Sequence, residues 1–328
     1  MALLITGSIA TDHLMTFEGR FADSLVVEQL DKVALSFLVT DLQVRRGGVA
    51  ANICFGLGSL GLTTVLVGAV GEDFVDYRSW LERHNVVCDH IHVSTSQHTA
   101  RFVCTNDASM AQIASFYAGA MSEAREIELK PIADRVGGVD YVLVGPNDPE
   151  AMLRHTQECR ERGYPFVADP SQQLAFGHGE MIRDLIDGAA ILFSNEYESA
   201  LITQKTGWSA EEILERVGTW VVTLGPAGAR IEQRGSAPIS VAAVPEIERV
   251  EPTGVGDAFR AGFLAARSWG LSLERAAQLG CLLAVYVIEG VGTQEYTLHR
   301  QGFLDRCEAA YGENVARELA RHVVTARP

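Results

Sequence analysis

The sequence predicts an α/β fold in which helices cover both faces of a doubly wound sheet. Short apolar runs rich in β-forming residues alternate with amphipathic helical stretches, a pattern typical of parallel strands joined by helical crossovers. The chain has 328 residues, of which 47% are hydrophobic and 21% charged, as in an ordinary globular protein. We therefore expect residues 1–328 to form a single α/β domain.

The strands and helices of this sheet follow from the hydrophobic pattern. Buried strands are expected at residues 3–6, 64–67, 141–144, 166–168, 191–193 and 221–223. Helical periodicity covers residues 148–162, 210–217, 256–268 and 272–288. Because these helices alternate with strands, they should pack on both faces of the sheet.

Two stretches break the alternation of strands and helices. Residues 14–44 and 91–116 show strand-like alternation without helices, for example at residues 33–39. We interpret them as one small β-sheet lid, formed by insertions at about residues 13–46 and 91–118. Such a lid closes over a substrate and excludes water.

Charge and composition restrict the partners. The formal net charge of -15, with no basic cluster longer than Arg45-Arg46, argues against nucleic acid. No basic segment precedes the apolar residues at the N-terminus, and the longest apolar run, residues 281–288, is too short to span a membrane. The six cysteines form no C-x-x-C pair and should be reduced, packed thiols. We expect a cytoplasmic protein that does not bind membranes.

The strongest local signal is Glu-Pro-Thr-Gly-Val-Gly-Asp at residues 251–257, which leads directly into a helical pattern. Free N–H groups at a helix N-terminus, with glycines that let the backbone approach closely, form an anion site. Asp257 would repel a phosphate there, which makes sense if it accepts a proton from a hydroxyl that attacks the phosphate. The alternative is a carboxylate that only stabilises the helix N-terminus, and the residues alone do not decide between the two.

Other polar residues follow the predicted strands. Gly47-Gly48 and Asn52 open a helix, and Asp12 follows the first strand, where ligands of open α/β sheets bind. Asp12 could hold paired sugar hydroxyls, whereas a turn with a helix cap accounts for the Gly-Gly pair without a ligand.

Two further segments lie at strand ends. Asn195 and Glu198 offer hard oxygen ligands suited to Mg²⁺ held largely through water, although a capping box accounts for the same spacing. The turn after the strand at 221–223 would suit a nucleotide's phosphates or ribose, but alone it is merely a turn. It consists of Thr223, Leu224, Gly225, Pro226, Ala227 and Gly228.

Taken together and in this order, these motifs resemble the ribokinase-like, or phosphofructokinase-B-type, family of carbohydrate kinases. The resemblance covers almost the whole chain. Within the family, residues 6–15, 110–117 and 169–175 are most similar to adenosine kinases of the actinobacterial, mycobacterial type. The family usually has Asp at position 251 and Ala at position 255, but Glu251 keeps the charge and Val255 keeps its backbone N–H.

The resemblance implies a ribokinase-like sheet and transfer of the γ-phosphoryl group of ATP to the 5′-hydroxyl of adenosine. Asp257 would be the base, and the N–H groups of Gly254, Val255 and Gly256 would stabilise the transferred group. The nucleoside would be bound by Ser8, Asp12, Ser36, Gly48, Asn52, Gln172, Gln173 and Asp257, with Phe102 and Phe116 sandwiching the purine. ATP would be bound by Asn195, residues 223–228 and Gly256, with Mg²⁺ near Asn195 and Glu198 and K⁺ as a candidate additional ion.

Two alternatives remain. A sugar kinase of the same family, acting on ribose or fructose 6-phosphate, would have no use for Phe102 and Phe116, although these side chains could simply pack the lid core. A catalytically silent nucleoside sensor would be expected to lack Asp257, which is present.

The lid also predicts the oligomeric state. A small sheet must bury one apolar face, so we expect a homodimer formed through the lids. The apolar side chains that alternate along the expected strands are Val33, Leu35, Phe37, Val39, Phe102 and Cys104.

Overall fold

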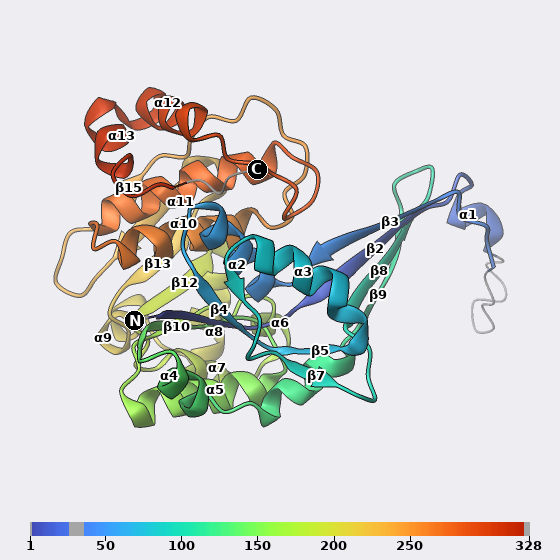
Figure 1. Cartoon of the computed structure of the whole chain (residues 1–328), viewed down its shortest axis with the longest axis horizontal. Helices are drawn as coiled ribbons and strands as arrows, with labels where there is room; N and C mark the ends of the chain where they lie inside the picture. The colour runs from blue at the N-terminus through green and yellow to red at the C-terminus, as the bar shows by residue number, and fades with distance from the viewer. Residues whose placement is uncertain (1, 26–35, 325–328) are drawn as a thin grey trace.

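The computed structural model describes residues 2–25 and 36–324 and contains a large central sheet (Figure 1). Its nine strands lie in the order β15-β14-β13-β12-β11-β10-β1-β4-β6. They are β1 (Ala2–Thr6), β4 (Thr64–Val67), β6 (Val86–Val87), β10 (Val139–Val144), β11 (Phe166–Ala168), β12 (Ile191–Asn195), β13 (Trp220–Thr223), β14 (Ala229–Glu232) and β15 (Ile239–Val241). The seven strands β6, β4, β1, β10, β11, β12 and β13 are parallel to one another. Strand β14 pairs antiparallel with β13, and β15 pairs antiparallel with β14. All the strands predicted for the sheet are confirmed.

Helices cover both faces of this sheet, as predicted. Alternate residues of a strand point to opposite faces, so Leu3 and Ile5 join one hydrophobic core and Leu4 joins the other. The first core includes residues of α2 (Val49–Ser59), α3 (Val75–Arg83), α10 (Val255–Ser268), α11 (Leu273–Ile288), α12 (Arg300–Tyr311) and α13 (Glu313–Leu319). The second includes residues of α4 (Lys130–Arg135), α5 (Pro149–Arg162), α6 (Gln173–Phe176), α7 (Gly179–Ile186), α8 (Glu196–Thr206) and α9 (Ala210–Arg216). The four predicted helices correspond to α5, α9, α10 and α11.

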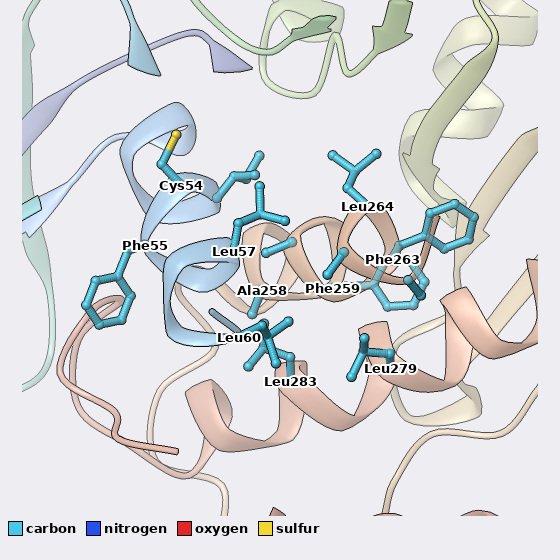
Figure 2. Close-up of a cluster of buried hydrophobic side chains, with 14 of the residues drawn as sticks. Cys54, Phe55, Leu57, Leu60, Ala258, Phe259, Phe263, Leu264, Leu279 and Leu283 are labelled. Carbon is cyan, nitrogen blue, oxygen red and sulfur yellow. The ribbon is translucent and has the colours of Figure 1, made fainter. Parts of the chain in front are cut away.

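Helix α10 is held in the core between α2 and α11 (Figure 2). Its Phe263 is fully buried, and truncating such a side chain to Ala typically costs about 3–5 kcal/mol of stability. The contact with α11 is close, because a Cβ on Gly262 would lie 2.5 Å from the Leu279 carbonyl oxygen. Close packing therefore fixes the position of α10, whose N-terminus carries Asp257.

A second, four-stranded sheet projects from the body and forms the lid (Figure 1). Its strands lie in the order β3 (Asp41–Gly47), β2 (Ala10–Thr16), β8 (Ala100–Asn106) and β9 (Gln112–Tyr117), and the short helix α1 (Phe21–Ser24) lies at its far end. Strand β7 (His92–Ser94) falls within the predicted lid segment but pairs with β5 (Ala69–Gly71) in a separate sheet.

The strand expected at residues 33–39 is wrong where it can be tested. Residues 36–39 are not in a strand, and residues 33–35 lie outside the described part of the chain. Phe37 instead packs against Phe17 and Phe21, with ring centroids 4.9 and 5.2 Å apart. Phe37 therefore joins an aromatic cluster, whereas Leu38 is exposed, and the lid strand starts later, at Asp41.

Two general expectations have counterparts in the structure. All six cysteines are buried and unpaired, which confirms packed thiols. Within residues 2–25 and 36–324, no helix has the length and apolar character needed to cross a bilayer.

Candidate active site

Two adjoining cavities lie at the carboxyl ends of the body strands. Strand β1 pairs with β4 on one side and with β10 on the other. The strands that follow β1 in the chain are therefore added first on one side of it and then on the other, so the strand order reverses at β1. Ligands of open α/β sheets bind at such a point. A cavity of about 900 Å³ lies between this edge and the lid, and a second of about 500 Å³ lies beside α10 and α11. Both are lined by Thr223, Gly225 and Gly256, so the cavities meet there.

The N-terminus of α10 lies at this junction. Gly254 is its N-cap in the left-handed region (φ 78°), and a Cβ there would lie 2.7 Å from Cγ2 of Thr293. Only glycine fits this position without strain. Gly254 lines the larger cavity, Val255 the smaller, and Gly256 both. The first-turn N–H groups of a helix have no partner within the helix, so this end suits an anion shared by the two cavities.

Asp257 lies in the first turn of α10 and lines the larger cavity. No side chain caps this helix terminus; Asp257 Oδ2 instead accepts a hydrogen bond from Asn52 Nδ2 at 2.8 Å. Burial raises the pKa of Asp257 to about 7, opposed by the Arg260 charge and the Asn52 hydrogen bond, while Asp169 raises it further. A carboxylate with a pKa near neutrality is suited to general base catalysis. This environment suits a base, and the position in the first turn equally suits a carboxylate that stabilises the helix N-terminus.

Arg260 is a site residue that the motifs did not identify. It lies one turn after Asp257, is buried, lines the larger cavity, and donates from Nη2 to Asp169 Oδ1 at 2.7 Å. A buried ion pair is costly to desolvate, so its position beside the anion site suggests a role in the chemistry. The available signal was a single charged residue in the apolar pattern that follows Asp257.

One row of side chains crosses the whole lid. Strand register places Arg45, Asp12, Phe102 and Phe116 side by side on β3, β2, β8 and β9, and the last three line the larger cavity. Burial raises the pKa of Asp12 to about 6, helped by Glu251 and opposed by Arg45. Phe116 is 53% exposed, so its ring is available to a ligand. The row thus offers a carboxylate next to two aromatic rings.

The sugar-binding candidates lie where the chain passes between the body and the lid and in the first turn of α2. Gly48 (φ 92°) passes so close to β2 that a Cβ would lie 2.6 Å from Ala10 N. Ser8 Oγ accepts from Val49 N at 3.0 Å, and Ser8, Gly48 and Asn52 all line the larger cavity. Asn52 Oδ1 already accepts two hydrogen bonds, so the amide has only its second N–H free for a ligand.

The remaining nucleoside candidates divide into two groups. Gln172 and Gln173 line the larger cavity, and Gln173 Nε2 donates to the Asn147 carbonyl at 2.9 Å. Ser36 is exposed, does not line the cavity, and precedes Phe37 in the aromatic cluster of the lid. The prediction for Ser36 is therefore not supported by this arrangement. Lining residues that the motifs did not reveal include Asn147, Ser171, Phe176 and Thr293.

Asn195 and Glu198 form the capping box and also line the larger cavity. Asn195 Oδ1 accepts from Glu198 N, and Glu198 Oε2 accepts from Asn195 N, both at 2.8 Å. The described residues contain no group of three or more Asp, Glu, His or Cys side chains that could enclose a metal ion. The oxygen atoms of Asn195 and Glu198 do fit Mg²⁺ held mainly by water and phosphate.

The smaller cavity contains most of the predicted nucleotide turn. Thr223, Gly225, Pro226 and Gly228 line it, whereas Leu224 and Ala227 do not and instead form the turn by an Ala227 N to Leu224 O hydrogen bond of 3.1 Å. Its other walls come partly from Pro252, Val255 and Gly256 of the motif at residues 251–257, and partly from residues 243–249, Phe259 and α11, which the motifs did not identify. These walls are largely apolar and suit a flat base.

The fold and this site define a phosphoryl-transferring kinase, and comparison with known proteins identifies the family. A family model described as pfkB family carbohydrate kinase matches residues 18–300. The chain therefore belongs to this family of ATP-dependent phosphotransferases and has the ribokinase fold.

Several relatives are nucleoside kinases. A structure of Burkholderia thailandensis nucleoside kinase in complex with inosine is 34% identical, covers 95% of this chain and 99% of its own, and has a TM-score of 0.82. The nucleoside kinase of Methanothermobacter thermautotrophicus is 31% identical over 295 residues, which are 89% of this chain and 91% of that protein. The nucleoside kinase of Methanocaldococcus jannaschii is 28% identical over 273 residues, 82% of this chain and 87% of that protein.

Proposed function

We propose that the protein is an adenosine kinase that converts ATP and adenosine to ADP and AMP. The observation that carries this proposal is the row of Asp12, Phe102 and Phe116, which faces the cavity that contains Asp257. Asp12 can accept hydrogen bonds from the ribose hydroxyls, while the rings beside it provide a surface on which a base can stack.

A free sugar fits this cavity less well than a nucleoside. Ribose would engage Asp12 and Asp257 but would leave the two lid aromatics without a partner. Fructose 6-phosphate would need a cation for its phosphate. Arg260 is the one basic residue among the described residues that line the larger cavity, and it is already paired with Asp169.

Gln173 places in the larger cavity an amide that can contact a purine base. One N–H of its Nε2 donates to the Asn147 carbonyl, which fixes the orientation of the amide and leaves Oε1 as an acceptor and the second N–H as a donor for a ligand. Oε1 matches the 6-amino group of adenine and the second N–H matches the 6-oxo group of hypoxanthine, so this residue offers a partner to either base. A broader purine nucleoside kinase is the second candidate, because the Burkholderia thailandensis enzyme has been crystallised with inosine.

In the proposed reaction, Asp257 takes the proton of the nucleoside's 5′-hydroxyl. The 5′-oxygen then bonds to the γ-phosphorus of ATP, while the bond between the γ-phosphorus and the departing ADP breaks. The N–H groups of Gly254, Val255 and Gly256 stabilise the charge on the transferred group, and Arg260 adds a fixed positive charge nearby. Mg²⁺, when bound near Asn195 and Glu198, supplies charge neutralisation for the phosphates.

The proposal does not assign a K⁺ site, and the effect of K⁺ on the reaction rate is left to be measured. Glu251, the acidic residue just before the anion site, already accepts from Arg45 Nη1 at 2.9 Å and from Gly292 N at 3.0 Å. An arginine cation thus neutralises the carboxylate in this arrangement.

Because ATP is the proposed donor, we place the protein in the cytoplasm.

The test is an ADP-release assay with Mg²⁺ and ATP against adenosine, inosine, guanosine, cytidine, ribose and fructose 6-phosphate, with and without KCl. Adenosine should give the highest kcat/KM, and Gln173→Leu, which removes both the acceptor and the donor of this amide, should lower kcat/KM for adenosine and for inosine. A higher kcat/KM for ribose or fructose 6-phosphate would overturn the nucleoside assignment. Nucleoside binding without turnover of any substrate would indicate a silent sensor.

We also propose a homodimer formed through the lids, although by a different face from the one that the sequence pattern predicts. Phe102 faces the substrate cavity, whereas Leu42, Val44, Ile113 and Tyr117 are 41–57% exposed, and the strand register places them on the opposite face. A second copy could cover these apolar side chains. Sedimentation should show a dimer at micromolar concentration and a monomer for Leu42→Glu combined with Val44→Glu; a wild-type monomer would refute the proposal.

A further inference from the structure

Gln294 is a fully buried polar residue that the proposed reaction does not yet use. It follows α11, has no exposed surface, and lines neither cavity. Its side chain is nevertheless fully engaged: Nε2 donates to Asn52 Oδ1 at 2.9 Å and to Tyr77 Oη at 2.6 Å, while Oε1 accepts from Trp80 Nε1 at 3.2 Å. Such a network is costly to bury unless every member is satisfied.

The direction of these hydrogen bonds is fixed by chemistry. An indole N–H can only donate, so the oxygen of Gln294 must face Trp80 and its NH₂ group must face Asn52. The oxygen of Asn52 must then face Gln294, and its NH₂ group faces Asp257, 2.8 Å away. The chain Trp80–Gln294–Asn52–Asp257 therefore ends with a donor aimed at the carboxylate.

This arrangement distinguishes the two protonation states of Asp257. An ionised carboxylate only accepts hydrogen bonds, so it fits the Asn52 NH₂ group. A protonated carboxyl also has an O–H donor, which would be stabilised by an acceptor such as the amide oxygen of Asn52. That would require the Asn52 amide to rotate and bring two NH₂ groups face to face. Thr293 cannot replace Gln294 fully, because its single hydroxyl proton faces both Asn52 Oδ1 (2.8 Å) and the Arg46 carbonyl (3.0 Å).

We propose that Gln294 is a positioning residue that holds the Asn52 amide as a donor toward Asp257 and thereby favours the ionised, active form of the base. This inference rests on the proposed role of Asp257 in phosphoryl transfer. Gln294 acts through Asn52 and touches neither substrate.

Other charged or titratable groups also surround Asp257 and must stay unchanged in a test. Arg260 lies on the same helix, Asp169 follows β11, and Tyr296 lies beyond α11, with Glu198 of α8 behind the Arg260–Asp169 pair. A neutral replacement at position 294 leaves all of them in place, so it changes the hydrogen-bond chain without adding or removing a charge.

The experiment compares the pH dependence of kcat for wild type and Gln294→Met at saturating adenosine and Mg·ATP. Met has a similar volume but no donor, so the midpoint of the rise in kcat should move up by about half to one pH unit. Above this midpoint, kcat should return to within about threefold of wild type, because Asp257 itself is intact. The matched control is Tyr77→Phe, which removes another hydrogen bond of Gln294 but leaves the chain to Asp257 unbroken.

The outcomes separate this inference from the proposed function. An unmoved midpoint in Gln294→Met, or an equal shift in Tyr77→Phe, would overturn the role of Gln294 while leaving Asp257 as the base. Full activity of Asp257→Asn would overturn both. If melting shows that Gln294→Met does not fold, the double variant Trp80→Phe with Tyr77→Phe decides. Trp80 N–H donates to Gln294 Oε1, and the Tyr77 hydroxyl donates to the Gly47 carbonyl and accepts from Gln294 Nε2, so the double variant removes both side chains that fix the orientation of the Gln294 amide; no upward shift there would overturn the inference.

Discussion

Replacing Asp257 with Asn tests the proposed mechanism most directly. The substitution keeps the size of the side chain, and the new amide can still accept from Asn52 Nδ2 through its oxygen. Its NH₂ group then takes the place of the free carboxylate oxygen, so that a donor replaces the acceptor that the 5′-hydroxyl needs. We therefore expect the Asp257→Asn protein to be folded and able to bind substrates but unable to take the proton.

The expected loss is about 10²- to 10⁴-fold in kcat, which corresponds to about 3–5 kcal/mol of transition-state stabilisation. Because the pKa of Asp257 is raised to about 7, wild-type kcat should fall about tenfold per pH unit below this value, and the residual activity of the variant should lack this dependence. ATP should bind equally well or more tightly, because a negative charge beside the phosphates is removed.

Melting temperature provides the control for folding. A carboxyl whose folded-state pKa of about 7 lies above its ordinary value of 3.8 stabilises the fold only while protonated, and this contribution is lost as pH rises through 7. Asp257→Asn should therefore melt higher than wild type at pH 8 and about equally at low pH. A folded variant with near-normal kcat at pH 8 would refute the assignment of Asp257 as the base.

Three further changes have defined outcomes. Phe102→Ala or Phe116→Ala should raise KM for adenosine by removing stacking worth about 1–3 kcal/mol per ring, while kcat/KM for ribose stays unchanged. Glu198→Gln keeps a capping-box residue but removes the charge, so the Mg²⁺ concentration needed for half-maximal rate should rise, whereas a purely structural Glu198 would leave it unchanged. Burial lowers the pKa of His155 to about 4, so the stability it contributes above pH 6.5 is lost as pH falls toward 4, and His155→Gln should flatten the melting temperature over that range.

The body of the fold was predictable because its strands are buried on both faces. A continuous apolar run such as 141–144, bounded by polar and glycine residues, is too short for a helix and fits a strand covered on both sides. The structure moves the start of this strand by only two residues, to Val139. The lid strand β3 was predicted only as part of the insertion at about residues 13–46, without bounds of its own, because its sequence, Asp-Leu-Gln-Val-Arg-Arg-Gly, is polar on one face and half exposed on the other. The apolar stretch before it gave the stronger signal, yet Phe37 uses that character to pack against Phe17 and Phe21.

The site was predictable where a residue belongs to a local motif. Gly254 and Asp257 combine a left-handed turn with a helix start, which sequence can reveal. Asn147 and Gln294 reach the site or its support only through tertiary contacts between distant segments, and each resembles an ordinary loop residue in its local sequence. Arg260 differs from its apolar neighbours in the sequence, but its pairing with Asp169 also depends on a distant segment. Their roles depend on the folded partner, which no local pattern contains.

The shared wall of the two cavities has a consequence for ligand design. Thr223, Gly225 and Gly256 border both spaces, so the two cavities adjoin at the point where the proposed reaction would bring the donor nucleotide to the acceptor hydroxyl. A single molecule made of two nucleosides joined through their 5′ positions by an oligophosphate chain could therefore occupy both cavities. Inhibition by a series of such molecules would measure the distance between the two nucleosides, with the best chain length acting as a molecular ruler.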